Sequence, residues 1–185
     1  MEKQYGFYIE LDRCVGCSAC SVACKMEHND PPLPGSPVGT QAAKRRRVVE
    51  ILAGSYPDFK KVFVSMSCFH CGEPACVAVC PAGAISKRAA DGIVVVDSNK
   101  CIGCHYCFFA CPFGVPQYGD DGTMQKCDFC LERLEKGLEP ACVNTCPAQA
   151  LHAGTMEELS KLVAEKAAIK LIGDTQPSVF FSLKK

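Results

Sequence analysis

The phrase PACVAVCPAGAI at residues 74–85 recurs as PACVNTCPAQAL at residues 140–151, with eight of the twelve positions identical. Each copy has two cysteines at C-x3-C spacing, followed at once by proline. A C-x3-C step at helical pitch sets both side chains on the same side of a turn, and proline does not continue a helix. The repeat therefore predicts two short helical turns, each presenting a pair of sulfur atoms.

The cysteines outside this repeat complete a larger pattern. The chain of 185 residues contains 16 cysteines, which fall into four groups of four with none left over. Group one is Cys14, Cys17, Cys20 and Cys24; group two is Cys68, Cys71, Cys76 and Cys80; group three is Cys101, Cys104, Cys107 and Cys111; group four is Cys127, Cys130, Cys142 and Cys146.

The spacing within the groups indicates iron-sulfur ligation. Groups one and three share C-x2-C-x2-C-x3-C, the ligand run of bacterial ferredoxins, in which three cysteines hold one [4Fe-4S] cluster and the fourth reaches a second cluster. Groups two and four are variants with four and eleven residues between their second and third cysteines. The sequence therefore predicts four [4Fe-4S] clusters, with groups that exchange their fourth ligands in pairs.

The choice of pairs follows from position along the chain. Groups two and three are separated by 20 residues, whereas groups one and four lie near the two ends. We expect two to pair with three and one with four; pairing one with two and three with four stays open as the alternative. The expected sets are a (Cys14, Cys17, Cys20, Cys146), b (Cys24, Cys127, Cys130, Cys142), c (Cys68, Cys71, Cys76, Cys111) and d (Cys80, Cys101, Cys104, Cys107).

Other uses of the cysteines fit less well. The close spacing favours convergence on a common point over disulfides between distant strands, and the N-terminal stretch has no secretory signal pattern. Zinc sites need neither the third cysteine of C-x2-C-x2-C nor the closing Cys-Pro. Four histidines are expected to be surface residues or neighbours of the ligands: His28, His70, His105 and His152.

The charge pattern indicates no nucleic-acid or membrane partner by itself. The net charge is zero, from 20 basic and 20 acidic residues. The basic run at residues 44–47 is predicted to be a solvated face or a partner contact, and no apolar stretch reaches the ~20 residues that cross a bilayer. Each oxidised cluster with its thiolates would add a charge of about −2. Basic residues beside the ligands could offset it: Arg13, Lys25, Lys87, Arg88, Lys100 and Lys126.

The intervening segments predict an α+β fold with two ferredoxin-like modules. Strands are expected in residues 6–14 and 92–101, a hairpin in 46–66, and a helix from a capping box at Thr155 and Glu158. Residues 177–183 are expected to form a last strand. The predicted units are an outer module (1–30 with 120–154), an inserted loop and hairpin (31–67), an inner module (68–119) and a C-terminal docking tail (155–185).

These features together resemble the iron-sulfur electron-transfer subunits of molybdopterin oxidoreductases, the dimethyl sulfoxide reductase family. The phrases QYGF, CIGCHYC and ACPFGVPQY are similar to those of the small subunits of dimethyl sulfoxide reductases. The resemblance implies the same pairing of the four groups and a partner subunit with a molybdenum or tungsten bis-molybdopterin guanine dinucleotide. It often implies a membrane subunit that exchanges electrons with quinol.

The expected function is electron transfer, because no catalytic triad, carboxylate pair or phosphate loop stands out. The chain would be a non-catalytic subunit that connects a quinol-linked or soluble donor to a molybdopterin subunit reducing a small acceptor. Dimethyl sulfoxide, other S- or N-oxides, polysulfide, thiosulfate, tetrathionate, arsenate and aromatics are candidates. A freestanding polyferredoxin and a zinc-stabilised interaction module are the alternatives. Without a signal of its own, the chain is expected to be cytoplasmic, or exported folded with a signal-bearing partner and peripheral to the membrane.

Overall fold

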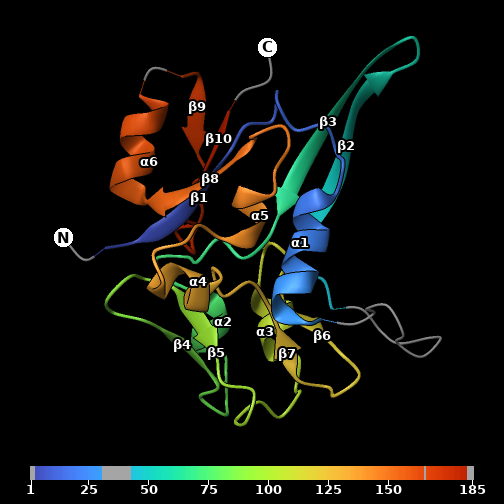
Figure 1. Cartoon of the computed structure of the whole chain (residues 1–185). Helices are drawn as coiled ribbons and strands as arrows, with labels where there is room; N and C mark the ends of the chain where they lie inside the picture. The colour runs from blue at the N-terminus through green and yellow to red at the C-terminus, as the bar shows by residue number, and fades with distance from the viewer. Residues whose placement is uncertain (1–2, 31–42, 165, 183–185) are drawn as a thin grey trace.

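A computed structural model describes residues 3–30, 43–164 and 166–182. It combines short helices with four small sheets, which confirms the predicted α+β class. Figure 1 shows the largest sheet at one end of the molecule and the short helices and hairpins of the middle of the chain at the other. The predicted Pro/Gly loop at residues 29–39 lies outside the described residues from Pro31 onward.

The largest sheet joins the two ends of the chain. Its strand order is β8-β1-β10-β9, with β1 antiparallel to β8 and parallel to β10. Phe7, Ile9 and Val179 have no exposed surface and lie in the main apolar core. The C-terminal segment, predicted as a docking tail, therefore supplies a central strand of this sheet. The strands are β1 (Tyr5–Ile9), β8 (Leu151–Thr155), β9 (Ala168–Lys170) and β10 (Val179–Ser182).

Helix α6 (Met156–Val163) packs on the sheet through Leu159, which contacts the cluster of Tyr8 and Phe180. Its N-terminus has the capping box: the Thr155 hydroxyl accepts the Glu158 amide hydrogen at 3.2 Å, and Glu158 accepts in return. Apolar residues continue at helical spacing through the stretch TMEELSKLVAEKAA (residues 155–168), but α6 ends at Val163. Ala168 instead pairs with Ser182 in the sheet. There the backbone groups of β9 find hydrogen-bond partners in β10, so they do not need the partners of a continued helix.

A long hairpin occupies the range where the sequence predicted one. Strands β2 (Arg47–Ser55) and β3 (Asp58–Met66) pair antiparallel over their whole length. Figure 1 shows the hairpin as an arm that projects from the body. Only its root is buried, at Val64 and Ser65. The insertion therefore contributes to the core only where it leaves the body.

Short elements surround groups two and three. Helices α2 and α3 pack together, and an apolar core of Ile85, Val94, Met124 and Cys107 lies behind them. A strand follows each of Pro81, Pro112 and Pro147: β4, β6 and β8. The elements of this region are α2 (Ala75–Ala78), β4 (Ile85–Lys87), β5 (Val94–Val96), α3 (Tyr106–Ala110), β6 (Gln117–Tyr118) and β7 (Met124–Gln125).

Groups one and four, from the two ends of the chain, lie side by side. Helix α1 (Ala19–His28) packs against α5 (Ala141–Asn144), and α4 (Leu131–Glu135) lies between the second and third cysteines of group four. Helices α2, α3 and α5 each end before a Cys-Pro pair, since the residue before proline is disfavoured in the α region. No proline follows Cys24, and α1 continues for four further residues.

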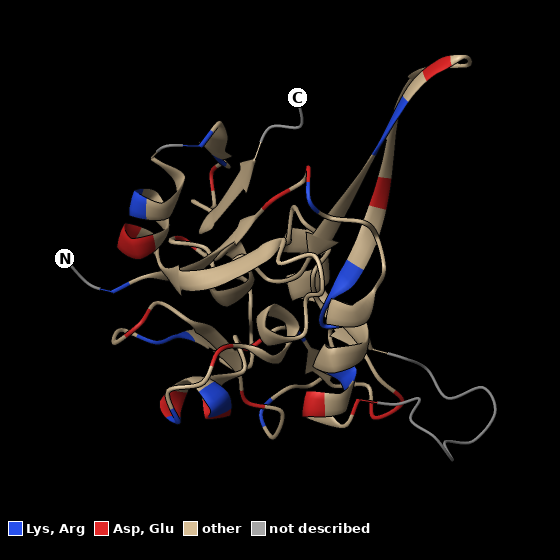
Figure 2. Cartoon of the chain, turned by 45° about the horizontal axis from the view of Figure 1, so that its top comes forward, with Lys and Arg blue, Asp and Glu red and all other residues tan. Residues whose placement is uncertain are grey.

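The prediction of a solvated face or a partner contact at residues 44–47 is wrong for Arg46, which is buried, while Arg45 and Arg47 are half-buried and Lys44 is exposed. Arg45 pairs with Asp30 at 2.6 Å, and Arg47 donates to the carbonyl oxygens of Phe113 and Gly114. Arg46 is 1% exposed. In Figure 2, basic residues on the hairpin and on the helices alternate with acidic ones. Among the described residues, no helix is long and apolar enough to cross a membrane.

Candidate iron-sulfur cluster sites

The first C-x2-C loop of each of the four groups shares one backbone feature. The residue before the second cysteine has a left-handed conformation in each: Gly16, His70, Gly103 and Phe129 have φ values of 73°, 43°, 65° and 66°. This conformation is rare outside glycine. Gly16 and Gly103 adopt it without steric cost, whereas the side chains of His70 and Phe129 are held there by nearly complete burial.

The left-handed residues direct backbone amides at sulfur. The His70 and Phe129 amides donate to Cys68 Sγ and Cys127 Sγ, each at 3.4 Å. The Gly16 amide donates to Cys14 in the same way. Hydrogen bonds of this kind favour the charged form of a thiolate. The loops are therefore built to stabilise negative charge on their first cysteines.

The repeated phrase has its own matching geometry. Two residues beyond each proline, Gly83 and Gln149 have φ values of 58° and 49°. The next amides, those of Ala84 and Ala150, donate to Cys80 Sγ and Cys146 Sγ, each at 3.3 Å. The sequence repeat thus encodes a second type of turn that returns an amide to the last cysteine of its group.

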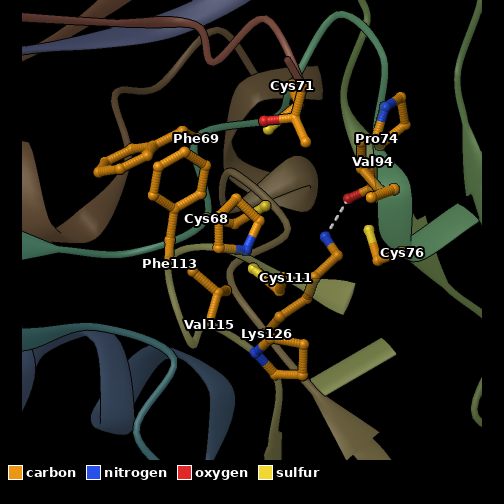
Figure 3. A pocket seen from close by; sticks show the side chains of 14 residues that line it. Cys68, Phe69, Cys71, Pro74, Cys76, Val94, Cys111, Phe113, Val115 and Lys126 are labelled. Atoms are coloured by element: carbon orange, nitrogen blue, oxygen red, sulfur yellow. Dashed lines mark hydrogen bonds between the residues drawn. The ribbon is translucent and has the colours of Figure 1, made fainter. Parts of the chain in front are cut away.

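One pocket brings together the cysteines predicted as set c. Cys68, Cys71, Cys76 and Cys111 all line it, from two groups that are separate in the sequence. Figure 3 shows these side chains around the pocket, with Lys126 extending between Cys111 and Cys76 toward the Val94 carbonyl oxygen. Burial, as the main cause, and the charge of the neighbouring Cys68, as a second one, raise the pKa of Cys76 to about 12.

A second pocket is lined by the cysteines predicted as set d: Cys80, Cys101, Cys104 and Cys107. The Met124 amide donates to Cys101 Sγ at 3.4 Å, and the Tyr118 hydroxyl lies 3.1 Å from Cys107 Sγ. The exposed His105 ring stacks on Tyr118 with ring centroids 3.8 Å apart. Strand β6 thus supplies a hydroxyl contact that the sequence pattern did not reveal.

The cysteines of the chain ends also interact across groups. Burial raises the pKa of Cys14, and charges on Cys20, Cys146 and Cys17 raise it further. These four are the predicted set a. For set b, burial raises the pKa of Cys24, with further contributions from Cys127, Cys142 and Cys130. Such thiols keep their protons until a metal displaces them.

The histidines occupy different environments. His28 Nε2 lies 3.8 Å from Cys130 Sγ and 3.3 Å from Asp128 Oδ1. His152 Nε2 pairs with Glu10 at 2.7 Å. His70 is fully buried and accepts the Val94 amide hydrogen at Nδ1. His28 and His70 are therefore neighbours of cysteines, which was one of the two predicted environments. His70 is buried and is not a surface residue.

The donor set fits [4Fe-4S] clusters. Two pockets are each lined by four cysteines, and backbone amides donate to several of the sulfur atoms. Amide hydrogens of this kind stabilise such clusters and tune their potentials. Of the six basic residues noted in the sequence, Lys126 is the one that is buried, and its positive charge lowers the pKa of Cys68, which burial raises. The residues present are therefore suited to an anionic iron-sulfur group.

Comparison with known proteins supports the same conclusion. The pattern of the 4Fe-4S dicluster domain matches residues 59–156, and a second pattern of the same description matches residues 13–85. The sequence is 43% identical to a component of the anaerobic dimethyl sulfoxide reductase of Escherichia coli over 178 residues, which cover 91% of this chain and 82% of that relative.

Relatives with other names align over similar lengths. A component of the sulfite dehydrogenase of Allochromatium vinosum is 36% identical, over 95% of this chain and 81% of its own length. A component of the selenate reductase of Mesobacillus selenatarsenatis is 34% identical, over 97% of this chain and 72% of its own length. The protein therefore belongs to the iron-sulfur subunits of the dimethyl sulfoxide reductase family, and its role is that of a non-catalytic electron-transfer subunit.

Proposed function

We propose that this chain holds four [4Fe-4S] clusters and relays single electrons between a quinol-linked or soluble donor and a molybdopterin catalytic subunit. The observation that carries the proposal is the pair of pockets that are each lined by four cysteines drawn from groups two and three. A [4Fe-4S] cluster supplies a one-electron carrier, and the chain's own residues provide its ligands and its electrostatic environment.

The cysteine sets a, b, c and d are proposed as the ligands of the four clusters. Two pockets lined by one set each support c and d. The mutual charge effects of Cys14 with Cys146, and of Cys24 with Cys127, support a and b. The alternative pairing would place Cys24 with Cys68, Cys71 and Cys76, whereas Cys111 is the fourth cysteine that lines their pocket, which supports the proposed pairing.

The proposed division into modules follows the sets. The outer module takes residues 1–30 and 120–154, and the inner module takes residues 68–119. The packing of α1 on α5 and of α2 on α3 supports this division. Residues 31–67 are proposed as an insertion whose hairpin lies at the module boundary, and residues 155–185 as a tail that completes the outer sheet and docks on a partner.

The two ends of the relay are proposed from exposure. Cys17 of set a and Cys104 of set d are the exposed cysteines of the described residues. Two positions before each lies an exposed apolar residue, Val15 at 64% and Ile102 at 69%. A partner that covers these residues would come close to the sulfur ligands, and short separation favours electron transfer. We propose one partner at each of these two loops.

The partner identity is proposed from the relatives. They are named as parts of dimethyl sulfoxide reductase, sulfite dehydrogenase and selenate reductase. A catalytic subunit with a molybdenum or tungsten bis-molybdopterin guanine dinucleotide is proposed at one end, with an S-oxide, another S- or N-oxide, or an oxyanion as terminal acceptor. A quinol-oxidising membrane subunit is proposed at the other.

The proposal is tested by metal analysis of the native complex. The chain is tagged, purified anaerobically from its host, and assayed for iron, acid-labile sulfide, zinc, molybdenum and tungsten. We expect about sixteen iron and sixteen sulfide per chain, additional iron and about one molybdenum or tungsten from the partner. Zinc without sulfide would overturn the cluster assignment. Iron and sulfide without molybdenum or tungsten would favour a freestanding polyferredoxin instead.

A further inference from the structure

Arg46 is the largest fully buried side chain among the described residues, with 1% of its surface exposed. Its Nη1 donates to the Ser65 hydroxyl at 2.9 Å and to the Ser65 carbonyl at 3.3 Å, and its Nη2 donates to the Ser67 hydroxyl at 2.8 Å. The guanidinium carbon lies 4.6 Å from the centre of the Phe7 ring. Within the described residues, none of these contacts is to a carboxylate.

The charges that surround this guanidinium belong to cysteines. Burial opposes the charged form of Arg46, yet its pKa is raised, because Cys142, Cys127, Cys20 and Cys24 attract the positive charge. Arginine keeps its proton in proteins, and a buried cation without a nearby anion is strongly destabilising. Once these sulfurs lose their protons as cluster ligands, they supply the counter-charge of Arg46.

A hydrogen-bonded chain connects the guanidinium to one of these sulfurs. The Ser65 hydroxyl accepts from Arg46 Nη1 and lies 3.3 Å from Cys20 Sγ. A thiolate accepts hydrogen bonds and cannot donate them, so Ser65 donates its own hydrogen to Cys20 when that sulfur is a ligand. Arg46 thus orients and polarises the hydroxyl that contacts Cys20.

The four cysteines divide between two of the proposed sets. Cys20 belongs to set a, whereas Cys24, Cys127 and Cys142 belong to set b. We infer that Arg46 is a positioning residue that holds a fixed positive charge between sets a and b and, with Ser65, raises the reduction potentials of the clusters they hold. The inference rests on the proposed four-cluster function.

The direction of the effect follows from charge. Reduction adds one electron from a supplied reductant, which takes a cluster with its thiolates from about −2 to about −3 without making or breaking a bond to the protein. A nearby cation stabilises the more negative form. Lys126 is the cation that acts on Cys68 and Cys76 of set c, and the charges that act on Cys107 of set d are those of Cys101 and Cys104. Sets c and d therefore serve as internal references.

The test compares variants of the tagged chain in its native complex by redox titration, followed by electron paramagnetic resonance. Arg46→Gln is expected to lower the reduction equilibrium constant at set b about tenfold or more, ~59 mV for one electron. The effect at set a is expected to be smaller, and sets c and d are expected to be unchanged. Arg46→Lys keeps the positive charge and should therefore keep the potentials of sets a and b close to those of the wild-type protein. Ser65→Ala should lower the potential of set a alone.

The matched control is Arg88→Gln, the same charge change at an arginine that is paired with Asp91 at 3.1 Å and Glu135 at 3.2 Å. The inference would be overturned if Arg46→Gln protein with all four clusters showed four unchanged reduction potentials. It would also be overturned if Arg46→Gln and Arg88→Gln shifted all four potentials by the same amount. If the Arg46→Gln protein does not assemble, the Ser65→Ala variant decides: an unchanged reduction potential at set a would overturn the inference. Wild-type protein without iron would instead refute the proposed function.

Discussion

Groups one and three have the same cysteine spacing but lie in different surroundings. In both, a left-handed glycine precedes the second cysteine, and a left-handed residue, Ser18 or His105, starts the helix. In both, the third cysteine is buried and contacts a hydroxyl, Ser65 for Cys20 and Tyr118 for Cys107. The local loop is therefore reproduced by local sequence.

The two groups differ in the helix that follows the loop and in the residues that pack around it. Group one continues into a ten-residue helix that buries Cys24, whereas α3 has five residues and ends at an extended Cys111. The hydroxyl near Cys20 is oriented by a buried arginine, whereas Tyr118 is stacked on an exposed histidine. The difference teaches that spacing determines which sulfurs bind, and tertiary contacts determine their electrostatic environment.

Loss of a fourth ligand should have the largest effect. Cys24→Ser should remove about four irons from set b, and Cys111→Ser the same amount from set c. Because Cys24 and Cys142 are proposed to hold one cluster, the double variant Cys24→Ser/Cys142→Ser should lose no more iron than either single variant. Anaerobic iron and sulfide analysis measures this.

The control for that prediction is Cys24→Ser/Cys76→Ser, whose losses should add. The reverse result, with additive losses for Cys24 and Cys142 and non-additive losses for Cys24 and Cys76, would support the alternative pairing of group one with group two.

The helix that distinguishes the two groups can be interrupted. Lys25→Pro should destabilise the protein by about 3 kcal/mol or more, because proline removes a helical hydrogen bond inside α1 and its ring clashes with the preceding turn. Pro112→Ala at the matching position of group three should have a much smaller effect, since α3 has already ended. Anaerobic thermal unfolding, followed by visible absorbance, compares them; equal losses would contradict the role assigned to the proline.

Gly16 and Gly103, which the two groups share, should differ in how well they tolerate substitution by alanine. An added Cβ at Gly103 would lie 2.7 Å from the Gly122 carbonyl oxygen, whereas at Gly16 it would meet the Phe63 ring at 2.7 Å. Both positions carry the left-handed penalty of about 1–2 kcal/mol. Backbone yields less easily than a half-buried ring on the hairpin, so Gly103→Ala should lower the thermal midpoint more than Gly16→Ala. The opposite order would show that the hairpin is the more rigid neighbour.

The smallest expected effect concerns the hydroxyl of group three. Burial raises the pKa of Tyr118, and its hydrogen bond to Cys107 raises it further, so the hydroxyl keeps its proton and donates to the sulfur. Tyr118→Phe should lower the potential of set d by less than the ~59 mV of a tenfold change. Redox titration measures this, with the other three sets as references; a shift shared by all four would indicate a general structural change.

The sequence alone was sufficient for the features that depend on neighbours in the chain. The four cysteine groups, the Cys-Pro helix ends, the strands before groups one and three and the capping box at Thr155 are all encoded within a few residues. The left-handed conformations of His70 and Phe129 were not predicted, because burial of large side chains stabilises what their backbone preference disfavours.

The tertiary structure decided the features that depend on residues far apart. It joined β10 to β1 from opposite ends of the chain, ended α6 early in favour of β9, and buried Arg46 within a run that looked like a solvated face. A buried cation is stable only where anions from other segments surround it. No local pattern around residue 46 can reveal that Cys20, Cys24, Cys127 and Cys142 meet there, because only folding brings their sulfurs together.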